Sequence, residues 1–169
     1  MERVVLFAPD DAEAYFRALA PGFRLHPQRG PDLGARLLHA IEDHLALGYE
    51  RVVIMDSDSP TLPAAYLEQA FALLDEHDVV LGPCEDGGYY LVGAKATHPD
   101  LFLGVQMSTP RVFADTAARV AAAGLTLGVL PAWYDVDYAA DVRRLRAELF
   151  RDGRETRYTA EFLRRHGDS

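Results

Sequence analysis

Two aspartates separated by one residue, Asp56 and Asp58, are the residues of this sequence best placed to do chemistry. They follow the apolar run 52–55, which is typical of a short strand buried on both faces. In open parallel sheets, ligands bind beyond the carboxyl ends of the strands, and Mg²⁺ prefers carboxylate oxygens. The pattern predicts a divalent metal on a phosphorylated ligand. The alternative is that one aspartate only caps the turn or the following helix.

A second acidic loop combines two carboxylates with two glycines. Glu85 and Asp86 precede Gly87 and Gly88, and Tyr89 begins the next predicted strand. Glycines at these positions allow a ligand to approach the backbone closely, with both carboxylates aimed at it. They are equally compatible with a plain hairpin turn, because glycine accepts a positive φ.

A third acidic loop, 131–137, repeats the first pattern after another predicted strand, with Asp135 and Asp137 separated by one residue. Asp137 either contributes to the acidic site or caps the helix that follows. Arg36 lies in the first turn of an earlier predicted helix, where a cation opposes the helix dipole. It is therefore a candidate partner for a carboxylate or a phosphate, and the alternative is a solvated arginine.

Apolar runs with strand character alternate with segments of helical periodicity along the chain. The expected strands cover 4–8, 23–26, 52–55, 78–82, 89–92 and 125–130. The first expected helix has Ala12, Tyr15, Phe16 and Leu19 on one face. The alternation predicts an α/β fold, a three-layer sandwich with a mostly parallel sheet. We expect one domain over 1–169, with its core in 3–150 and a peripheral tail over 151–169 that has a weak helix near 158–165.

Composition excludes several classes of function. The net charge of −9 argues against general binding to nucleic acid or to anionic membranes. The single cysteine, Cys84, rules out an intramolecular disulfide and is expected to be inert. No apolar run approaches the length of a membrane span, and the first residues lack the layout of a signal peptide. We therefore expect a cytoplasmic protein.

Four stretches together resemble a known family. They are 28–36, 58–63, 82–93 and 135–137. The sequence resembles a bacterial family with a glycosyltransferase-A-like fold, whose members are often described as arsenosugar-biosynthesis-type glycosyltransferases. It is more distantly similar to nucleotidyltransferases that activate small phosphorylated molecules, such as those of molybdenum-cofactor and coenzyme F420 synthesis. The most specific stretch is the Glu-Asp-Gly-Gly-Tyr run within 82–93.

The resemblance implies a Rossmann-like fold of the nucleotide-diphospho-sugar transferase type. Asp58 would hold Mg²⁺ or Mn²⁺ on a nucleotide diphosphate, with Asp56 helping. Asp137 would be a further metal ligand or an acceptor-side base, and Asp86 completes the expected catalytic set. Residues 85–89 would line the acceptor pocket. The implied partners are a nucleotide sugar or a nucleoside triphosphate and a small-molecule acceptor.

The family usually opens with another strand and a basic loop of the form K-x-P-x-x-G-x-x-K-T-R-L, and Met1 aligns with the family's second strand. We therefore expect a chain that folds but transfers nothing by itself, with Arg29 and Arg36 as the nearest substitutes for the loop. Its strand 4–8 would pair directly with 52–55, or the open edge would form a homodimer. The alternative function is a catalytically inactive relative that serves as a binding or scaffold protein.

Overall fold

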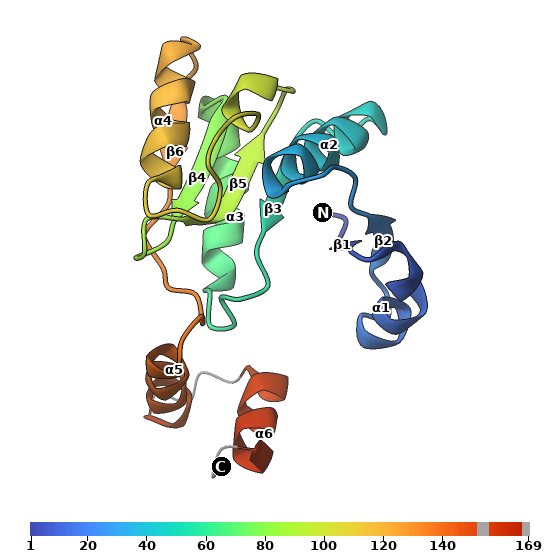
Figure 1. Cartoon of the computed structure of the whole chain (residues 1–169), viewed down its shortest axis with the longest axis vertical. Helices are drawn as coiled ribbons and strands as arrows, with labels where there is room; N and C mark the ends of the chain where they lie inside the picture. The colour runs from blue at the N-terminus through green and yellow to red at the C-terminus, as the bar shows by residue number, and fades with distance from the viewer. Residues whose placement is uncertain (152–155, 167–169) are drawn as a thin grey trace.

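The computed structural model describes residues 1–151 and 156–166 and shows an α/β protein with two sheets (Figure 1). The smaller sheet pairs β1 (Val4–Phe7) in parallel with β2 (Arg24–Pro27). The larger sheet has the order β3-β5-β4-β6, with β3 (Val52–Met55), β4 (Val79–Pro83), β5 (Tyr89–Ala94) and β6 (Leu127–Val129). In it β3, β4 and β6 run in one direction and β5 runs in the other.

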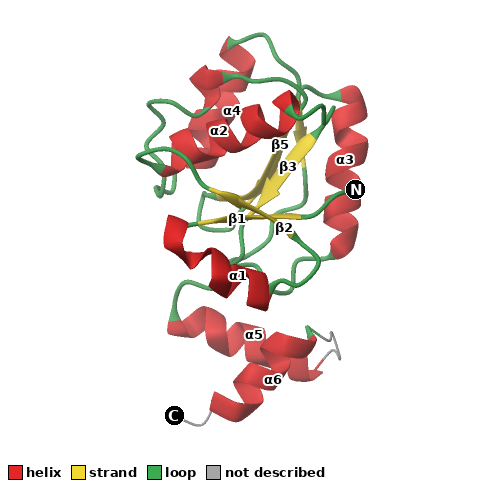
Figure 2. Cartoon of the chain, turned by 90° about the vertical axis from the view of Figure 1, so that its right-hand side faces the viewer, coloured by secondary structure: helices red, strands yellow, loops and turns green. Residues whose placement is uncertain are grey.

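Helices cover both faces of the larger sheet (Figure 2). α2 (Leu33–Ala46) and α4 (Val112–Ala122) pack on one face, together with the short 3₁₀ helix η2 (Pro99–Leu101). α3 (Ala64–Glu76) packs on the other face. The predicted α/β sandwich with a mostly parallel sheet is thus confirmed.

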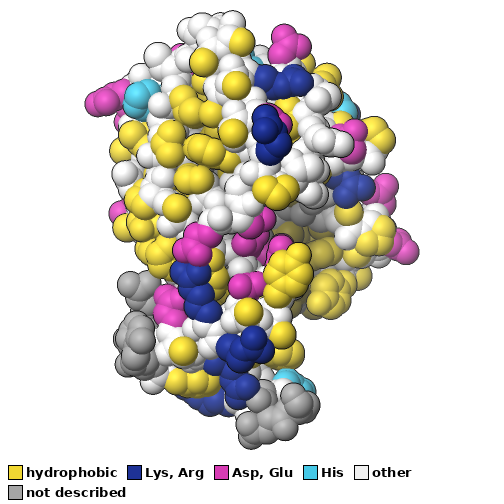
Figure 3. Space-filling model, turned by 60° about the vertical axis from the view of Figure 1, so that its left-hand side comes forward, with side chains coloured by type: hydrophobic (Ala, Val, Ile, Leu, Met, Phe, Trp, Pro, Cys, Tyr) yellow, Lys and Arg dark blue, Asp and Glu magenta, His cyan; other side chains and the backbone are white. Residues whose placement is uncertain are grey.

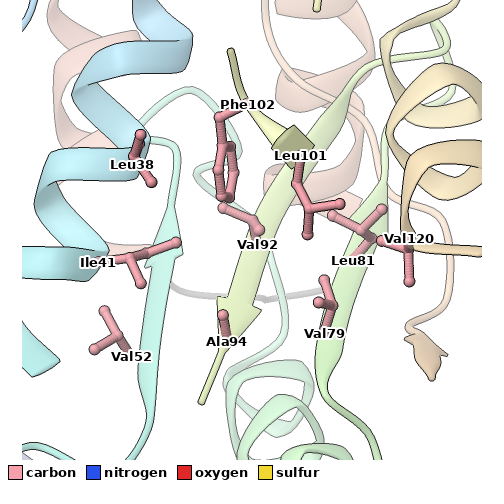
Figure 4. Packing of buried hydrophobic residues seen from close by; sticks show 10 residues of the cluster. All are labelled: Leu38, Ile41, Val52, Val79, Leu81, Val92, Ala94, Leu101, Phe102 and Val120. Atoms are coloured by element: carbon pink, nitrogen blue, oxygen red, sulfur yellow. The ribbon is translucent and has the colours of Figure 1, made fainter. Parts of the chain in front are cut away.

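The alternation of side chains along each strand divides the core in two. Val79 and Leu81 of β4 point toward α2 and α4, into the cluster drawn in Figure 4. Val80, between them, points toward α3 and packs with Leu74. All four side chains are fully buried. A strand that is apolar on both faces needs a helix layer on each side, which is why this sequence forms three layers.

The strand directions bring three loops to one edge of the larger sheet. β3, β4 and β6 are mutually parallel, so their carboxyl ends lie at the same edge, beside the start of β5. The loops that leave this edge are 56–63, 84–88 and 130–138. These are the three acidic loops of the sequence, so the fold gathers their carboxylates.

The expected pairing of residues 4–8 with 52–55 is wrong. β1 pairs with β2 because the crossover through η1 (Asp10–Ala12) and α1 (Glu13–Leu19) returns the chain alongside β1 in parallel. Within the described residues, β3 has a strand partner on one side only. As an edge strand β3 is only partly buried: Val52 and Ile54 pack on one face and Val53 on the other, whereas Met55 is 41% exposed.

The apolar face predicted for the first helix is not buried either. α1 has no buried residue, and Tyr15 and Leu19 are 65% and 63% exposed. The helix packs on the two-stranded sheet, where Phe16 lies against Phe7 with ring centroids 5.7 Å apart. Helical spacing predicts which residues share a face, but the area buried depends on the size of the layer beneath.

The last two helices form a pair beyond the edge from which the acidic loops leave (Figure 1). α5 (Ala139–Arg151) and α6 (Arg157–His166) bury Leu145, Leu149, Ala160 and Leu163 against each other. α6 corresponds to the helix expected near 158–165. Among the described residues, no helix is both long and apolar enough to span a membrane.

Two leucines, one buried and one exposed, provide a test of the described packing. Leu38 is 4% exposed in the core and Leu19 is 63% exposed on α1. We expect Leu38→Ala to reduce the free energy of unfolding by about 2–5 kcal/mol, because it leaves a cavity. The same substitution at Leu19 is expected to change it by no more than about 0.5 kcal/mol. Urea denaturation followed by circular dichroism measures both, and similar losses at the two positions would contradict the described packing.

Candidate functional site

Backbone hydrogen bonds join the three acidic loops directly. The amide of Val136 donates to the carbonyl of Asp58 over 2.9 Å, which ties the β6 loop to the β3 loop. The amide of Trp133 donates to Pro83, and that of Glu85 donates back to Trp133, each over 3.0 Å. The parallel pairing of β4 with β6 is thereby extended past the strand ends into the loops. The site is held by main-chain contacts that do not depend on the acidic side chains.

Among the residues that the structure describes, a group of possible metal ligands lies where these loops meet. Single ligand atoms of Cys84, Asp86 and Asp135 all lie within 4.8 Å of one another. Cys84 is buried, Asp135 is half-buried and Asp86 is exposed, so the group extends from the core to the surface. Two hard carboxylate ligands at this spacing suit Mg²⁺ or Mn²⁺ better than a soft metal.

Asp56 is the least satisfied carboxylate of the site. Its Oδ2 accepts a hydrogen bond from Ser59 over 3.2 Å, whereas its Oδ1 is buried and has no partner among the described residues. Burial, opposed by the Ser59 hydrogen bond and reinforced by the negative charges of Asp58 and Asp135, raises the pKa of Asp56 to about 6. Such a carboxylate gains most from a bound cation or a proton, because either one removes the unfavourable buried charge.

The same physics acts on the two neighbours of Asp56. Burial raises the pKa of Asp135 above its ordinary value. A hydrogen bond to its own backbone opposes this shift, and repulsion from Asp86 and Asp137 reinforces it. Burial and the charges of Asp135 and Asp56 raise the pKa of the Cys84 thiol. A protonated thiol is a poor ligand and a poor nucleophile, so the chemistry of the group lies in its carboxylates.

Asp58 and Asp137, two of the predicted metal ligands, lie at the exposed rim of the site. Asp58 accepts a hydrogen bond from Ser57 over 3.2 Å, and its backbone is the one bonded to Val136. At the start of α5, it is Asp141 that accepts from the amides of Asp137 and Tyr138, over 3.3 and 2.8 Å. These capping bonds leave the exposed Asp137 carboxylate facing solvent at the end of the loop.

Glu85 and Tyr89, predicted to line the acceptor pocket, have partners within the protein. Glu85 accepts two hydrogen bonds from the guanidinium of Arg144, over 2.6 and 2.9 Å. Those hydrogen bonds hold the pKa of Glu85 below its ordinary value. Tyr89 packs against the core near α2 and α4, its hydroxyl lies 3.8 Å from the sulfur of Met107, and burial raises its pKa to about 12.

The paired glycines form the β4–β5 turn at the same edge as Asp58. Gly87 has a φ of +95°, as glycine at this turn allows. Its amide donates to Cys84 and its carbonyl accepts from Phe113, over 3.2 and 3.0 Å. The amide of Gly88 donates to Asp86 Oδ1 over 2.8 Å. Both amides are therefore engaged in hydrogen bonds within the turn.

Arg36 is engaged with the loop that precedes its helix. Its guanidinium donates to the carbonyl of Gly30 over 3.2 Å and to the side-chain oxygen of Gln28 over 3.3 Å. Arg29, in the same loop, makes two hydrogen bonds to Asp43, over 3.1 and 2.5 Å. Arg36 therefore stabilises the loop that enters α2, and Arg29 ties the same loop to the last turn of α2.

Asp135 is the site residue that sequence reasoning missed. In the 131–137 loop, the family resemblance points to Asp137 as the metal ligand or base. Asp135, however, is the carboxylate grouped with Asp86, and it is close enough to Asp56 to raise the pKa of Asp56. The spacing of the two aspartates does not distinguish them. The isolated bridge between Cys84 and Trp133 does, because it carries the strand pairing to within two residues of Asp135.

The raised pKa of Asp56 predicts a specific pH dependence. Because the folded state binds the proton more tightly than the unfolded state, Asp56 increasingly lowers stability as pH rises from its ordinary pKa of 3.8 to about 6. Without divalent ions, Asp56→Asn should therefore gain stability relative to the parent between about pH 4.5 and about pH 7.5. Urea denaturation at both pH values tests this, with Asp11→Asn as control, because Asp11 is exposed on η1, outside the acidic loops. A difference that does not grow with pH would contradict the burial of Asp56.

Gly87 and Gly22 give a matched test of the turn, because both have positive φ. A Cβ at Gly22 meets no atom within 4 Å, whereas at Gly87 it would lie 2.0 Å from the Pro110 carbonyl oxygen. We expect Gly22→Ala to cost about 1–2 kcal/mol of backbone strain. Gly87→Ala should cost about 1–3 kcal/mol more, because the 108–113 segment must move. Equal losses of unfolding free energy would show that this segment does not rest on the turn.

Comparison with solved structures supports the fold. A crystal structure described as a "putative nucleotide-diphospho-sugar transferase" from Desulfovibrio desulfuricans G20 matches this chain with a TM-score of 0.87. The two sequences are 32% identical, and the match covers 97% of this chain and 72% of the other. The similarity therefore extends over all the layers described above.

Comparison with family profiles identifies the family of the chain from its sequence. Residues 1–109 match a family described as "uncharacterized protein conserved in bacteria (DUF2064)". No curated protein matches this sequence. The matched span is more than half of the 169 residues and includes the loops after β3 and β4. The chain therefore belongs to this bacterial family, and its fold is that of nucleotide-diphospho-sugar transferases.

Proposed function

We propose that this chain is a glycosyltransferase that uses a nucleotide sugar and holds Mg²⁺ or Mn²⁺ between its acidic loops. The observation that carries the proposal is the buried Asp56 Oδ1, which has no partner among the described residues and lies beside other carboxylates. A buried, unpaired carboxylate oxygen costs free energy unless an ion or a proton satisfies it. The likeness to the Desulfovibrio desulfuricans G20 protein supports a nucleotide sugar as the donor.

The residues present fit a hard divalent cation. Asp56, Asp86 and Asp135 offer carboxylates from three loops, and Asp58 adds an exposed one at the rim. When bound, such an ion neutralises charge on the leaving diphosphate, as it does in other phosphoryl and glycosyl sites. In a chain of net charge −9, an anionic donor needs this local neutralisation.

The acceptor side of the reaction falls to the exposed carboxylates. The bond between the sugar carbon and the diphosphate oxygen breaks, and a bond from that carbon to an acceptor hydroxyl oxygen forms. The hydroxyl proton goes to a carboxylate, for which Asp137 is the candidate because it is solvent-facing at the rim of the cluster. The resemblance to arsenosugar-biosynthesis-type glycosyltransferases makes small hydroxylated molecules the first acceptors to test.

A second candidate function is a binding protein without turnover. The observation that favours it is the engagement of Arg29 with Asp43 and of Arg36 with Gln28 and Gly30. Both arginines are the nearest replacements for a basic phosphate-binding loop, and both already have partners within the loop before α2 or on α2 itself. A chain that binds a nucleotide sugar weakly and transfers nothing fits this arrangement.

Ligand binding is expected to stabilise the folded chain. At about a hundred times its dissociation constant, a nucleotide sugar with Mn²⁺ should add about 2.7 kcal/mol, a rise in melting temperature of about 5–10 °C. The rise should be lost in Asp135→Asn and kept in Asp115→Asn, whose carboxylate lies on α4 and pairs with Arg111. A rise that survives Asp135→Asn, or no rise with any nucleotide sugar, would refute the proposed site.

Turnover separates the two functions. The same nucleotide sugars, and nucleoside triphosphates as a nucleotidyl-transfer arm, are incubated with Mn²⁺ and small hydroxylated acceptors, and release of the nucleotide is measured. Release that requires Asp56, Asp86 and Asp135 supports the transferase. Stabilisation without release supports the binding protein.

A further inference from the structure

Helix α5 contacts all three acidic loops through a connected set of side chains. Arg144 makes two hydrogen bonds to Glu85, and its Cζ lies 3.8 Å from the centre of the Tyr134 ring. The Tyr134 hydroxyl donates to Glu148 over 2.6 Å. Thr61 donates to the Tyr134 hydroxyl over 3.2 Å and lies 3.4 Å from Glu148. Glu85, Tyr134 and Thr61 belong to the loops after β4, β6 and β3, respectively.

Each contacted residue is a sequence neighbour of a site carboxylate. Glu85 precedes Asp86, Tyr134 precedes Asp135, and Thr61 follows Asp58 by three residues. A shift of α5 is therefore transmitted through one peptide bond to two of the grouped carboxylates. None of the five contacting side chains belongs to that group, so their arrangement around α5 needs an explanation of its own.

The contacts between α5 and the loops, which we call the clamp, have a buried centre and an exposed margin. Tyr134 and Thr61 are buried, at 4% and 6% exposure, so their hydrogen bonds to each other and to Glu148 form a protected centre. Arg144 and Glu85 are about half exposed, and an exposed pair alone contributes little to stability. Two-point hydrogen bonding and stacking on Tyr134 nevertheless fix the direction of the Arg144 guanidinium. α6 supports the helix from behind through Leu145 and Leu149.

Repulsion between the carboxylates of the three loops acts against the contacts made by α5. Asp135 repels Asp56 and is itself repelled by Asp86, and this repulsion acts to separate the loops that carry them. In Figure 3, acidic and basic side chains lie side by side at the level where the helical pair joins the body. A separated cluster would lose its spacing for a divalent ion, whose ligand distances tolerate little change.

We propose that Arg144 and Glu148 are positioning residues, which act through Glu85 and Tyr134 to hold the three acidic loops at the spacing that a divalent cation and the donor diphosphate require. This inference rests on the proposed function of the site. The five contacts constitute a clamp that is separate from the ligands themselves. Loss of its members should affect cation affinity more than overall stability.

The sign of one effect distinguishes positioning from simple electrostatics. Arg144 carries a positive charge near the acidic cluster, so removing that charge alone should tighten binding of a cation. If Arg144 positions the loops, Arg144→Gln should instead weaken binding of Mn²⁺ by about tenfold, the usual order for residues that orient metal ligands. Arg143→Gln removes the same charge from an exposed neighbour that makes none of these contacts, and it should leave the affinity unchanged or slightly higher.

The experiment measures Mn²⁺ affinity of the full chain by calorimetry, with circular dichroism and melting temperature to verify folding. Tyr134→Phe, which keeps the ring but loses the hydroxyl, should also weaken binding. Arg144→Lys keeps the charge but not the two-point contact, and it should bind weakly as well; it replaces Arg144→Gln if that variant does not fold. Wild-type affinity in Arg144→Gln or Arg144→Lys would overturn the positioning role alone. No Mn²⁺ binding by the parent chain would instead overturn the proposed function.

Discussion

The pairing of β5 with β3 on one side and with β4 on the other is the contact on which the rest of the structure depends. Because β5 is antiparallel to both neighbours, β3 and β4 must be parallel to each other, and β6 follows β4. Three loops therefore leave one edge, and the β4–β5 turn is one of them. If β5 ran parallel to its neighbours, a long crossover would have to replace the tight β4–β5 turn, and the turn that holds Asp86 at this edge would be lost.

The site combines favourable backbone geometry with unfavourable side-chain charge. Main-chain bonds such as that between Val136 and Asp58 are insensitive to protonation, and the layers of the core fix the strand ends. Burial, reinforced by neighbouring carboxylates, then raises the pKa of Asp56 and of Asp135. Unfavourable electrostatics of this kind are common at functional sites, and the rest of the fold must be stable enough to offset their cost.

Much of the architecture follows from patterns within short windows of sequence. Val79–Leu81 is apolar at every position, so it requires a layer on each face, and α3 and α4 supply them. Tyr15 and Leu19 show the limit of such reasoning: their spacing predicts a helix face, but not that only two strands lie beneath it.

Of the candidate site, the three acidic loops were predictable and their internal partners were not. Glu85 is engaged by Arg144, which is 59 residues away in sequence, and no local pattern encodes that contact. The choice between Asp135 and Asp137 likewise depends on where β4 and β6 stop pairing. A short motif reports which chemistry a loop can perform. Long-range contacts decide which of its residues are free to perform it.

The turn at Gly87 links the acidic edge to a distant part of the chain. Its carbonyl bonds Phe113, and the Pro110 carbonyl oxygen occupies the space that a side chain would need. The segment between η2 and α4 is thus anchored at both ends, with Arg119 binding the carbonyls of Asp100, Leu103 and Gly104. Insertions and deletions between η2 and α4 should therefore be rare among relatives that keep the Gly-Gly pair. The length of α1, which packs on the two-stranded sheet, should vary more.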